Sequence, residues 1–424
     1  MQTLLASVIS LFVSLLFVNA GNSYLLTLIG VQLGLNHVPP MDVGYIMSSY
    51  AVGFVTGTLF TPALLKKVGH IRAFSALASV TGMAAISYPF SDTMLFWCLL
   101  RAVGGFVVAG LFVVIESWVS SIASNENRSK IFAIYLVAAY SASALGQLAI
   151  GYASEQGVYF AFALAGLLIF SSIIPLSISS RNSPSVENST SMSPFRLARR
   201  ALLGLVGAVL GGMLLSSFYG LVPLYGSLSE MTPEDIGSLM FSAVVAAMVS
   251  AWPIGWLSDR IPRSTVLVGV LLAGTGAAIV VYLLGHYIPS LIYICIPVIM
   301  ASFAAIYSIS VAITNDLVEN EERIAASSTL LMGYGVGSII GPIGGSWLME
   351  SMSADALFLG FACVTSFLIV FATYRQFKQS PIPVELQDQF VPTIPEVQVN
   401  GDINSPGVVA EDEPQNPVNK ADTN

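Results

Sequence analysis

The sequence predicts an all-α membrane protein in which twelve transmembrane helices form two similar halves of six. Composition is the first reason, because the 424 residues are 55% hydrophobic and only 9% charged, against roughly 25% charged residues in a soluble domain. The second reason is that apolar runs of membrane-spanning length recur along the chain. The third is that the second half repeats features of the first. We therefore expect the lipid bilayer to surround most of the chain.

The apolar runs fall into two groups of six, and each run is long enough to cross about 30 Å of hydrocarbon. The predicted spans are 4–33, 43–63, 73–90, 94–120, 131–153, 157–179, 201–227, 236–257, 265–285, 291–314, 328–349 and 356–374. Residues 1–180 then form the N-terminal half, and residues 201–374 form the C-terminal half. A Ser-, Pro- and Arg-rich linker at 181–200 joins them, and 375–424 is a disordered acidic tail.

The basic residues predict the orientation of the helices. Of the 16 Lys and Arg residues, 15 fall in alternate loops or in the tail, and the opposite loops contain none. The positive-inside rule then places both termini, the linker and the tail in the cytoplasm. We expect a multi-pass protein of the bacterial inner membrane. Only Arg101 is left within the membrane.

The two halves also resemble each other in sequence. The stretch "MDVGYIMSSY" (41–50) aligns with "EDIGSLMFSA" (234–243), which matches Gly44 with Gly237 at a separation of 193 residues. A separation of 195 matches Gly146 with Gly341. A parallel repeat of six helices is a transporter architecture in which substrate binds between the halves near the middle of the membrane.

Several motifs resemble those of the major facilitator superfamily over residues 1 to 375. The stretch "GWLSDRIPR" is similar to the family's loop signature Gly-x-x-x-Asp-Arg-x-Gly-Arg, with Pro262 at the position of the second Gly. "RAVGGFVVAG" resembles the family's fourth-helix motif, and "GYGVGSIIGPIGG" resembles a motif of exporters. The pattern is most similar to the bacterial YcaD-type subfamily. The resemblance implies alternating access by rocking of the two halves, with export favoured over import.

Charged residues near the cytoplasmic helix ends are candidates for a gate. Asp259 ends the eighth span, and the expected partners of Arg260 and Arg263 are Asp316 and the run 319–323, which includes Arg323. Glu116 lies about a turn from the cytoplasmic end of its helix, within reach of Lys66, Lys67 or Arg72. Gly341 and Pro342 could mark a bend or a moving contact. The alternatives are a topology signal for the basic residues and a static kink at the proline.

Arg101 lies about 10 Å inside the membrane, where an unpaired guanidinium is costly and usually faces a cavity or a partner. We assign it to the central cavity, where it meets carbonyl groups, a tyrosine or an anionic group of the substrate. Other polar residues of the spans are weaker candidates for contact with substrate, because such residues often join helices or mark the interface. They are Asn19, Asn22, Tyr24, Tyr140, Gln147, Tyr219 and Tyr225.

The sequence favours a secondary transporter of a small organic solute that is polar or anionic. It contains no phosphate-binding Gly-Lys-Ser/Thr loop, no His-Glu-x-x-His motif and no serine nucleophile elbow, which argues against an ATP-driven pump and an enzyme. We expect coupling to an ion gradient, with protons as the candidate ion, a monomer, and no cofactor, metal site or nucleic-acid partner. The alternative is a membrane receptor or scaffold that transports nothing.

Overall fold

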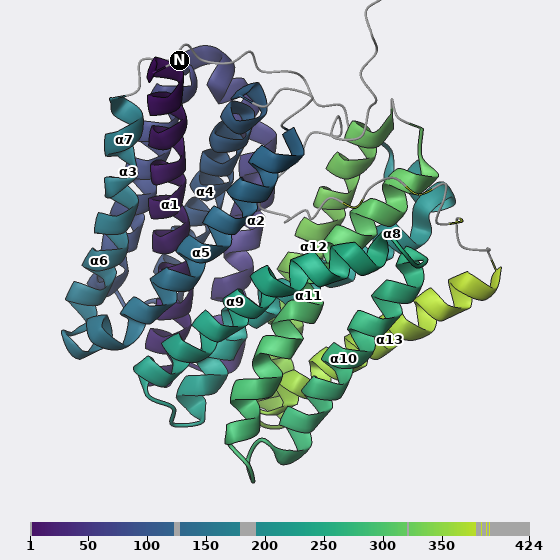
Figure 1. Ribbon diagram of the computed structural model, residues 1–424. Helices are drawn as coiled ribbons and strands as arrows, with labels where there is room; N and C mark the ends of the chain where they lie inside the picture. The colour runs from purple at the N-terminus through teal and green to yellow at the C-terminus, as the bar shows by residue number, and fades with distance from the viewer. Residues whose placement is uncertain are drawn as a thin grey trace, which may run out of the picture.

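The computed structural model describes residues 2–122, 128–178, 192–319 and 322–378, together with Pro383, Gln387 and Phe390. The elements in these ranges are helical (Figure 1). The N-terminal half contains α1 (Gln2–Leu35), α2 (Pro40–Val68), α3 (His70–Ser87), the 3-10 turn η1 (Tyr88–Phe90), α4 (Met94–Ile122), α5 (Arg128–Glu155), α6 (Val158–Ser171) and α7 (Ile173–Ser177). The C-terminal half contains α8 (Pro194–Leu228), α9 (Pro233–Ser258), α10 (Arg263–Leu284), α11 (Ser290–Leu317), α12 (Arg323–Ser351) and α13 (Ala356–Lys378).

Within the described residues, 12 segments are long and apolar enough to cross a membrane, as the sequence predicts. The helices α6 and α7 form one of these segments, and α3 with η1 forms another. A helix is the natural form for such a segment because it satisfies its own backbone hydrogen bonds in hydrocarbon. The all-α, twelve-span fold class is therefore confirmed.

The boundary between the linker and the C-terminal half differs from the prediction. The helix α8 begins at Pro194, ahead of the predicted boundary at 201, and bends at Ala201, where φ is −128° and ψ is 53°. A proline is compatible with the first turn of a helix because its missing N–H would have no intrahelical partner there. The bend explains why hydropathy places the start of the span later. The rest of the linker and the tail beyond Phe390 lie outside the described residues.

The backbone repeats between the halves with the separation that the sequence predicts. His37 and Glu230 are the non-glycine residues with positive φ in the described chain, at 53° and 59°. They lie 193 residues apart, and each follows the end of the first helix of its half. A positive φ is uncommon outside glycine, so its occurrence at both equivalent turns supports a structural repeat.

Close helix packing repeats in the same way. A Cβ at Gly146 of α5 would collide with the carbonyl of Ala20 in α1, and a Cβ at Gly341 of α12 would collide with the carbonyl of Met213 in α8. Ala20 and Met213 are themselves 193 residues apart. Small residues at these positions allow the helix backbones to approach each other. The alignment of Gly146 with Gly341 is thus confirmed by equivalent contacts.

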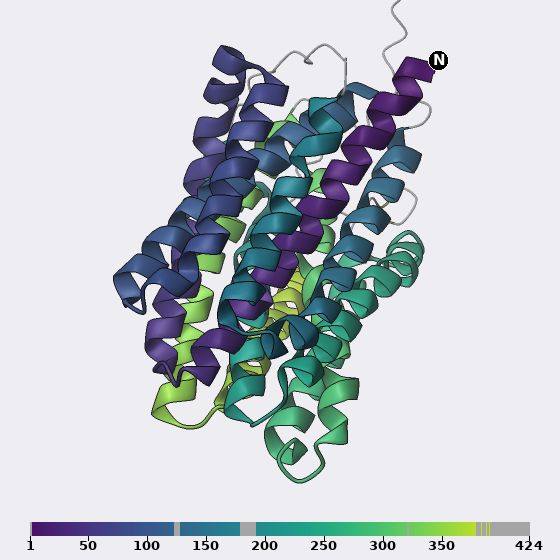
Figure 2. The ribbon, with the colours of Figure 1, turned by 90° about the vertical axis from the view of Figure 1, so that its left-hand side faces the viewer.

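The two halves meet along three pairs of helices, α1 with α8, α2 with α12 and α5 with α9. We call the end of the bundle that holds Lys66, Lys67 and Arg263 the basic side, and the end that holds Asp42 and Glu350 the acidic side. The chain begins on the basic side, at the top of Figure 1. Figure 1 and the rotated view in Figure 2 show the helices of both halves running between these two ends.

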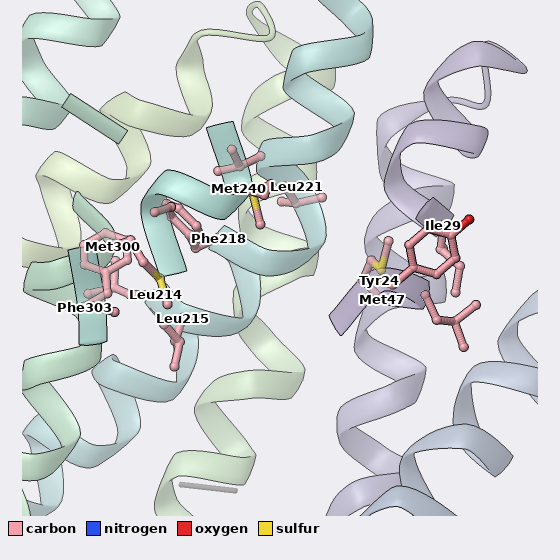
Figure 3. Packing of buried hydrophobic residues seen from close by; sticks show 14 of the residues in the cluster. Tyr24, Ile29, Met47, Leu214, Leu215, Phe218, Leu221, Met240, Met300 and Phe303 are labelled. Carbon is pink, nitrogen blue, oxygen red and sulfur yellow. The ribbon is translucent and has the colours of Figure 1, made fainter. Parts of the chain in front are cut away.

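Each half contains packed aromatic rings within one continuous apolar core. In the N-terminal half the ring of Tyr88 meets that of Phe162 in α6 at 5.3 Å. In the C-terminal half the ring of Phe218 in α8 meets that of Phe303 in α11 at 6.3 Å, and Phe303 meets Phe361 in α13 at 5.0 Å. Figure 3 shows Phe218, Phe303 and their aliphatic neighbours on one side of the view, with Tyr24 of the N-terminal half on the other. Because each half is packed internally, it can move as a unit.

Candidate functional site

The halves approach each other closely on the acidic side. A Cβ at Gly30 of α1 would lie 2.9 Å from Pro223 of α8, and a Cβ at Gly34 would collide with Ser227. The Ser227 hydroxyl also donates a hydrogen bond of 3.2 Å to the carbonyl of Val31. The first helices of the two halves are therefore in close contact near their acidic-side ends.

A second acidic-side contact joins α2 to α12 through Glu350, which the sequence analysis missed. The backbone N–H of Met41 donates to a carboxylate oxygen of Glu350 over 2.8 Å. The helix α2 begins with Pro40 and has no side-chain cap of its own, so Glu350 supplies an acceptor to its N-terminus. A signal was present, because Glu155 and Glu350 are acids 195 residues apart, at equivalent helix ends.

The aligned glycines Gly44 and Gly237 both lie at contacts between the halves. A Cβ at Gly44 of α2 would lie 2.9 Å from the carbonyl of Pro342 in α12, and a Cβ at Gly237 of α9 would lie 2.6 Å from the carbonyl of Gln147 in α5. Both positions are on the acidic side of the helix middle. Pro342 thus belongs to the contact between α2 and α12, while its role in bending stays a prediction.

Arg101 of α4 is 3% exposed and packs against α2 and the turn η1. Its guanidinium carbon lies 4.3 Å from the ring centroid of Tyr50, and the guanidinium interacts electrostatically with Tyr88. Its Nε has no hydrogen-bond partner among the described residues. Of the environments expected from the sequence, the tyrosine contact is the one that the structure contains.

Glu116 is 5% exposed, on the side of α4 nearest the basic end. Its carboxylate acts electrostatically on Tyr307 of α11, across the boundary between the halves. Tyr307 in turn meets Tyr334 of α12, with ring centroids 5.3 Å apart. Pairing of Glu116 with Lys66, Lys67 or Arg72 stays a prediction, and Lys67 and Arg72 are exposed at the ends of their helices.

Three of the residues predicted to contact substrate join helices within one half. The Tyr24 hydroxyl donates to the carbonyl of Ala161 in α6 at 3.0 Å and is fully buried. The Gln147 amide nitrogen donates to the Ser23 hydroxyl at 2.5 Å, joining α5 to α1. Tyr225 packs on the ring of Phe358 at 4.8 Å. Tyr24, Gln147 and Tyr225 therefore have structural partners in this conformation, and their contact with a substrate stays a prediction.

The other four residues predicted to contact substrate lie on helices that contact the opposite half. Asn19 is buried, and its amide donates to the carbonyl of Leu15 in the same helix at 3.0 Å. Asn22 in α1, Tyr140 in α5 and Tyr219 in α8 are partly buried. The helices that carry them are α1, α5 and α8, and each of these helices contacts the other half. Their contact with a substrate stays a prediction.

On the basic side, Arg263 contacts Asp316 as the sequence analysis expects. The Arg263 Nε lies 3.0 Å from an Asp316 carboxylate oxygen, and the two side chains are 3% and 4% exposed. The pair joins the beginning of α10 to the end of α11. Arg323, at the beginning of α12, is 7% exposed. Both arginines are thus held inside the C-terminal half, and their part in a gate stays a prediction.

The contacts of Arg260 differ from the prediction, which places it against Asp316 or the acids at 319–322. Its guanidinium lies over the ring of Trp256 at 3.9 Å and donates to the Trp256 carbonyl at 3.2 Å. Trp256 lies one helical turn earlier on α9, so the contact is local and does not depend on the conformation of another loop. The acid Glu322 instead contacts Arg196 and Arg200 at the beginning of α8.

Asp259, the acid of the stretch "GWLSDRIPR", contacts the tail. The backbone N–H of Phe390 donates to the Asp259 Oδ1 at 2.7 Å. The Phe390 side chain is 8% exposed and covers Gly255, where a Cβ would lie 2.9 Å from the ring. The sequence analysis expected a disordered tail, and Phe390 departs from that expectation.

Comparison with known families decides the identity of this twelve-helix arrangement. The family described as Major Facilitator Superfamily matches residues 8–301 and 228–401. The chain belongs to the major facilitator superfamily. Members of this superfamily are membrane transporters rather than enzymes, so the two halves and their contacts are those of a transporter.

Individual relatives agree with this assignment. The MFS-type transporter YcaD of Salmonella enteritidis is 29% identical over 389 residues, which covers 91% of this chain and 99% of the relative. The YcaD protein of Salmonella dublin has the same identity and coverage. The resemblance to the YcaD-type subfamily that the sequence motifs suggest is thereby confirmed.

Solved structures share the superfamily fold at low sequence identity. The nucleoside transporter NupG matches with a TM-score of 0.70 at 15% identity, covering 90% of this chain and 100% of NupG. A bacterial homolog to the human lysosomal transporter Spinster, in an inward-facing and occupied conformation, matches with a TM-score of 0.70 at 13% identity, covering 91% and 97%.

Proposed function

We propose that this superfamily member is a secondary transporter that moves a small polar or anionic organic solute across the bacterial inner membrane by alternating access. The observation that carries the proposal is the distribution of contacts between the halves. On the acidic side, helices of the two halves pack closely at Gly30, Gly34 and Gly44, and Glu350 caps a helix of the opposite half. Such contacts can close one side while each half stays packed internally.

The direction of opening follows from the orientation proposed for the helices. The basic residues place the basic side in the cytoplasm, so contacts on the acidic side close the protein toward the outside. The solved Spinster homolog that resembles this chain is inward-facing and occupied, which supports an inward-facing state. In this state a solute would enter or leave through the cytoplasmic side.

Arg101 is the proposed determinant for an anionic group of the solute. Its guanidinium is buried, and its Nε has no hydrogen-bond partner among the described residues. A carboxylate, phosphate or sulfonate accepts two parallel hydrogen bonds from a guanidinium, which a tyrosine ring cannot do. Displacement of the Tyr50 ring, which lies 4.3 Å away, would therefore give the guanidinium a stronger partner.

Ion coupling and direction are part of the same proposal. The chain has no ATP-binding loop, so a gradient of ions or solute must drive net transport. Protons are the proposed coupling ion, and export is favoured by the resemblance of "GYGVGSIIGPIGG" to exporter motifs. Because the N-terminal half carries the Arg101 site and the contacts between halves are within one chain, a monomer is sufficient for this mechanism.

Flux into proteoliposomes tests the proposal. A panel of radiolabelled organic anions, each with a neutral analogue of similar size, is measured with and without an imposed proton gradient. We expect at least one anion to be taken up more than its analogue, with partial loss in Arg101→Lys and near-complete loss in Arg101→Ala. The exposed Lys378 provides a control, because Lys378→Ala removes a cation far along the chain from this site. Uptake that is unaffected in Arg101→Ala would refute the role of Arg101.

A further inference from the structure

The tail residue Phe390 occupies a seat at the basic-side end of α9. The seat consists of Gly255, whose missing side chain leaves room for the ring, and Asp259, which accepts the Phe390 backbone N–H at 2.7 Å. The three atoms nearest to a Cβ at Gly255 all belong to the Phe390 ring. Phe390 is 8% exposed and belongs to the main apolar cluster of the protein. The contact therefore combines apolar burial with a charge-assisted hydrogen bond.

The seat is distant from the helix to which the tail is attached. The helix α13 ends at Lys378 and packs against α8, α10 and α12, whereas the seat is on α9. Phe390 lies twelve positions after Lys378, and a chain of that length can span at most about 40 Å. The tail thus reaches a helix that packs against the N-terminal half, which gives it access to the boundary between the halves.

The face of α9 that carries the seat is also the face that contacts the N-terminal half. Gly255 lies 18 residues after Gly237, which is five helical turns, and a Cβ at Gly237 would lie 2.6 Å from the carbonyl of Gln147 in α5. Arg260 stays on Trp256 of its own helix, at 3.9 Å from the ring, and does not pair with the Asp259 carboxylate. When the basic side closes, this face at the end of α9 would approach α5, and the Phe390 ring would lie between the two helices.

We propose that Phe390 is a cis-acting clamp that binds the end of α9 and holds the basic side open. With the tail seated, one carboxylate oxygen of Asp259 is engaged by the Phe390 backbone, and the ring covers the small-residue surface at Gly255. Closure then requires release of the ring and loss of this hydrogen bond. The clamp rests on the proposed alternating-access function, and it adds control of the cycle by the protein's own tail.

The test compares two phenylalanine truncations by spin-label distances across the basic side. Labels are placed at Val68 at the end of α2 and at Glu319 after α11, both exposed. Phe390→Ala removes the seated ring, and Phe377→Ala is the matched control because that ring is 86% exposed on α13. We expect the ratio of closed to open states to rise about tenfold or more in Phe390→Ala, from the burial that is lost, and to stay unchanged in Phe377→Ala.

Deuterium exchange tests the contact itself. Asp259→Asn keeps an acceptor oxygen at the same position, whereas Asp259→Ala removes it. We expect the amide of Phe390 to exchange on the order of tenfold faster in Asp259→Ala than in the wild-type protein, with an intermediate rate in Asp259→Asn. An unchanged distance distribution in Phe390→Ala, or equal exchange in all three proteins, would overturn the clamp. Absence of flux for every solute of the panel in the wild-type protein would instead count against the proposed function.

Discussion

Two adjacent glycines of α4 provide a sharp test of the helix packing beneath Arg101. A Cβ at Gly105 would lie within 3 Å of the Tyr50 carbonyl and 2.9 Å from the Phe54 nitrogen of α2, and real Cβ atoms essentially never lie so close. A Cβ at Gly104 has no atom within 4 Å. The two positions share one helix, so Gly→Ala gives the same gain in helix propensity, about 1 kcal/mol, at both.

The expected difference between the two variants follows from this geometry. Relief of the collision in Gly105→Ala requires α2 and α4 to separate, and overpacking of this kind costs about 1–3 kcal/mol. Gly104→Ala should be neutral or stabilising by up to about 1 kcal/mol. Because Tyr50 is the residue that contacts Arg101 at 4.3 Å, Gly105→Ala should also weaken solute binding, whereas Gly104→Ala should not.

Thermal unfolding in detergent at one scan rate, followed by size-exclusion chromatography, measures the difference. We expect Gly105→Ala to melt a few degrees below Gly104→Ala. Solute binding is then compared at a temperature where both variants are folded. Equal melting temperatures, or a larger loss in Gly104→Ala, would refute the close packing of α2 against α4 at Gly105.

Three further predictions concern the two sides of the bundle. Asp316→Asn leaves the buried Arg263 without this anion and should cost about 3–5 kcal/mol in stability, and Arg263→Met combined with Asp316→Leu should recover most of that loss. An equal melting temperature for Asp316→Asn and the wild-type protein would contradict the burial of the pair. Glu350→Ala should widen the acidic side more than Glu350→Gln, whose amide oxygen still accepts a hydrogen bond, as spin-label distances across that side report; equal distances in both variants would argue against the cap. In a protein whose cysteines are replaced by alanine, a cysteine at Asn36 should react with an impermeant maleimide in intact cells and one at Val68 should not, and the reverse pattern would overturn the orientation.

Hydropathy was sufficient to predict the number of membrane spans, because a span depends on local composition, and aligned residues of the two halves predicted the repeat. The positive φ of His37 and Glu230 and the contacts of Gly146 and Gly341 agree with the repeat. The start of α8 was harder to predict, because the bend at Ala201 separates the polar first turns from the apolar part of the helix.

The candidate site was less predictable, because sequence does not specify which neighbour a polar side chain meets. Tyr24 and Gln147 looked like cavity residues, yet they satisfy hydrogen bonds between helices of one half. Arg260 was paired with distant acids, yet the nearer Trp256 supplies both a ring and a carbonyl. The repeat relates Glu350 to Glu155 as acids at equivalent helix ends, but the partner of Glu350 is a backbone N–H of the other half, and the sequence does not specify which N–H that is.

The most direct test of alternating access is a pair of distance distributions measured in the same lipid bilayer. One pair of spin labels at Asn36 and Ser229 spans the acidic side, and the other at Val68 and Glu319 spans the basic side; all four residues are exposed. Rocking of two rigid halves predicts two populations for each pair, in which a shift toward the long distance on one side accompanies a shift toward the short distance on the other. Glu350→Ala should shift the acidic-side pair toward its long distance and the basic-side pair toward its short distance. A single unchanging distance on both sides, in the wild type and in Glu350→Ala, would contradict the mechanism and favour a non-transporting scaffold.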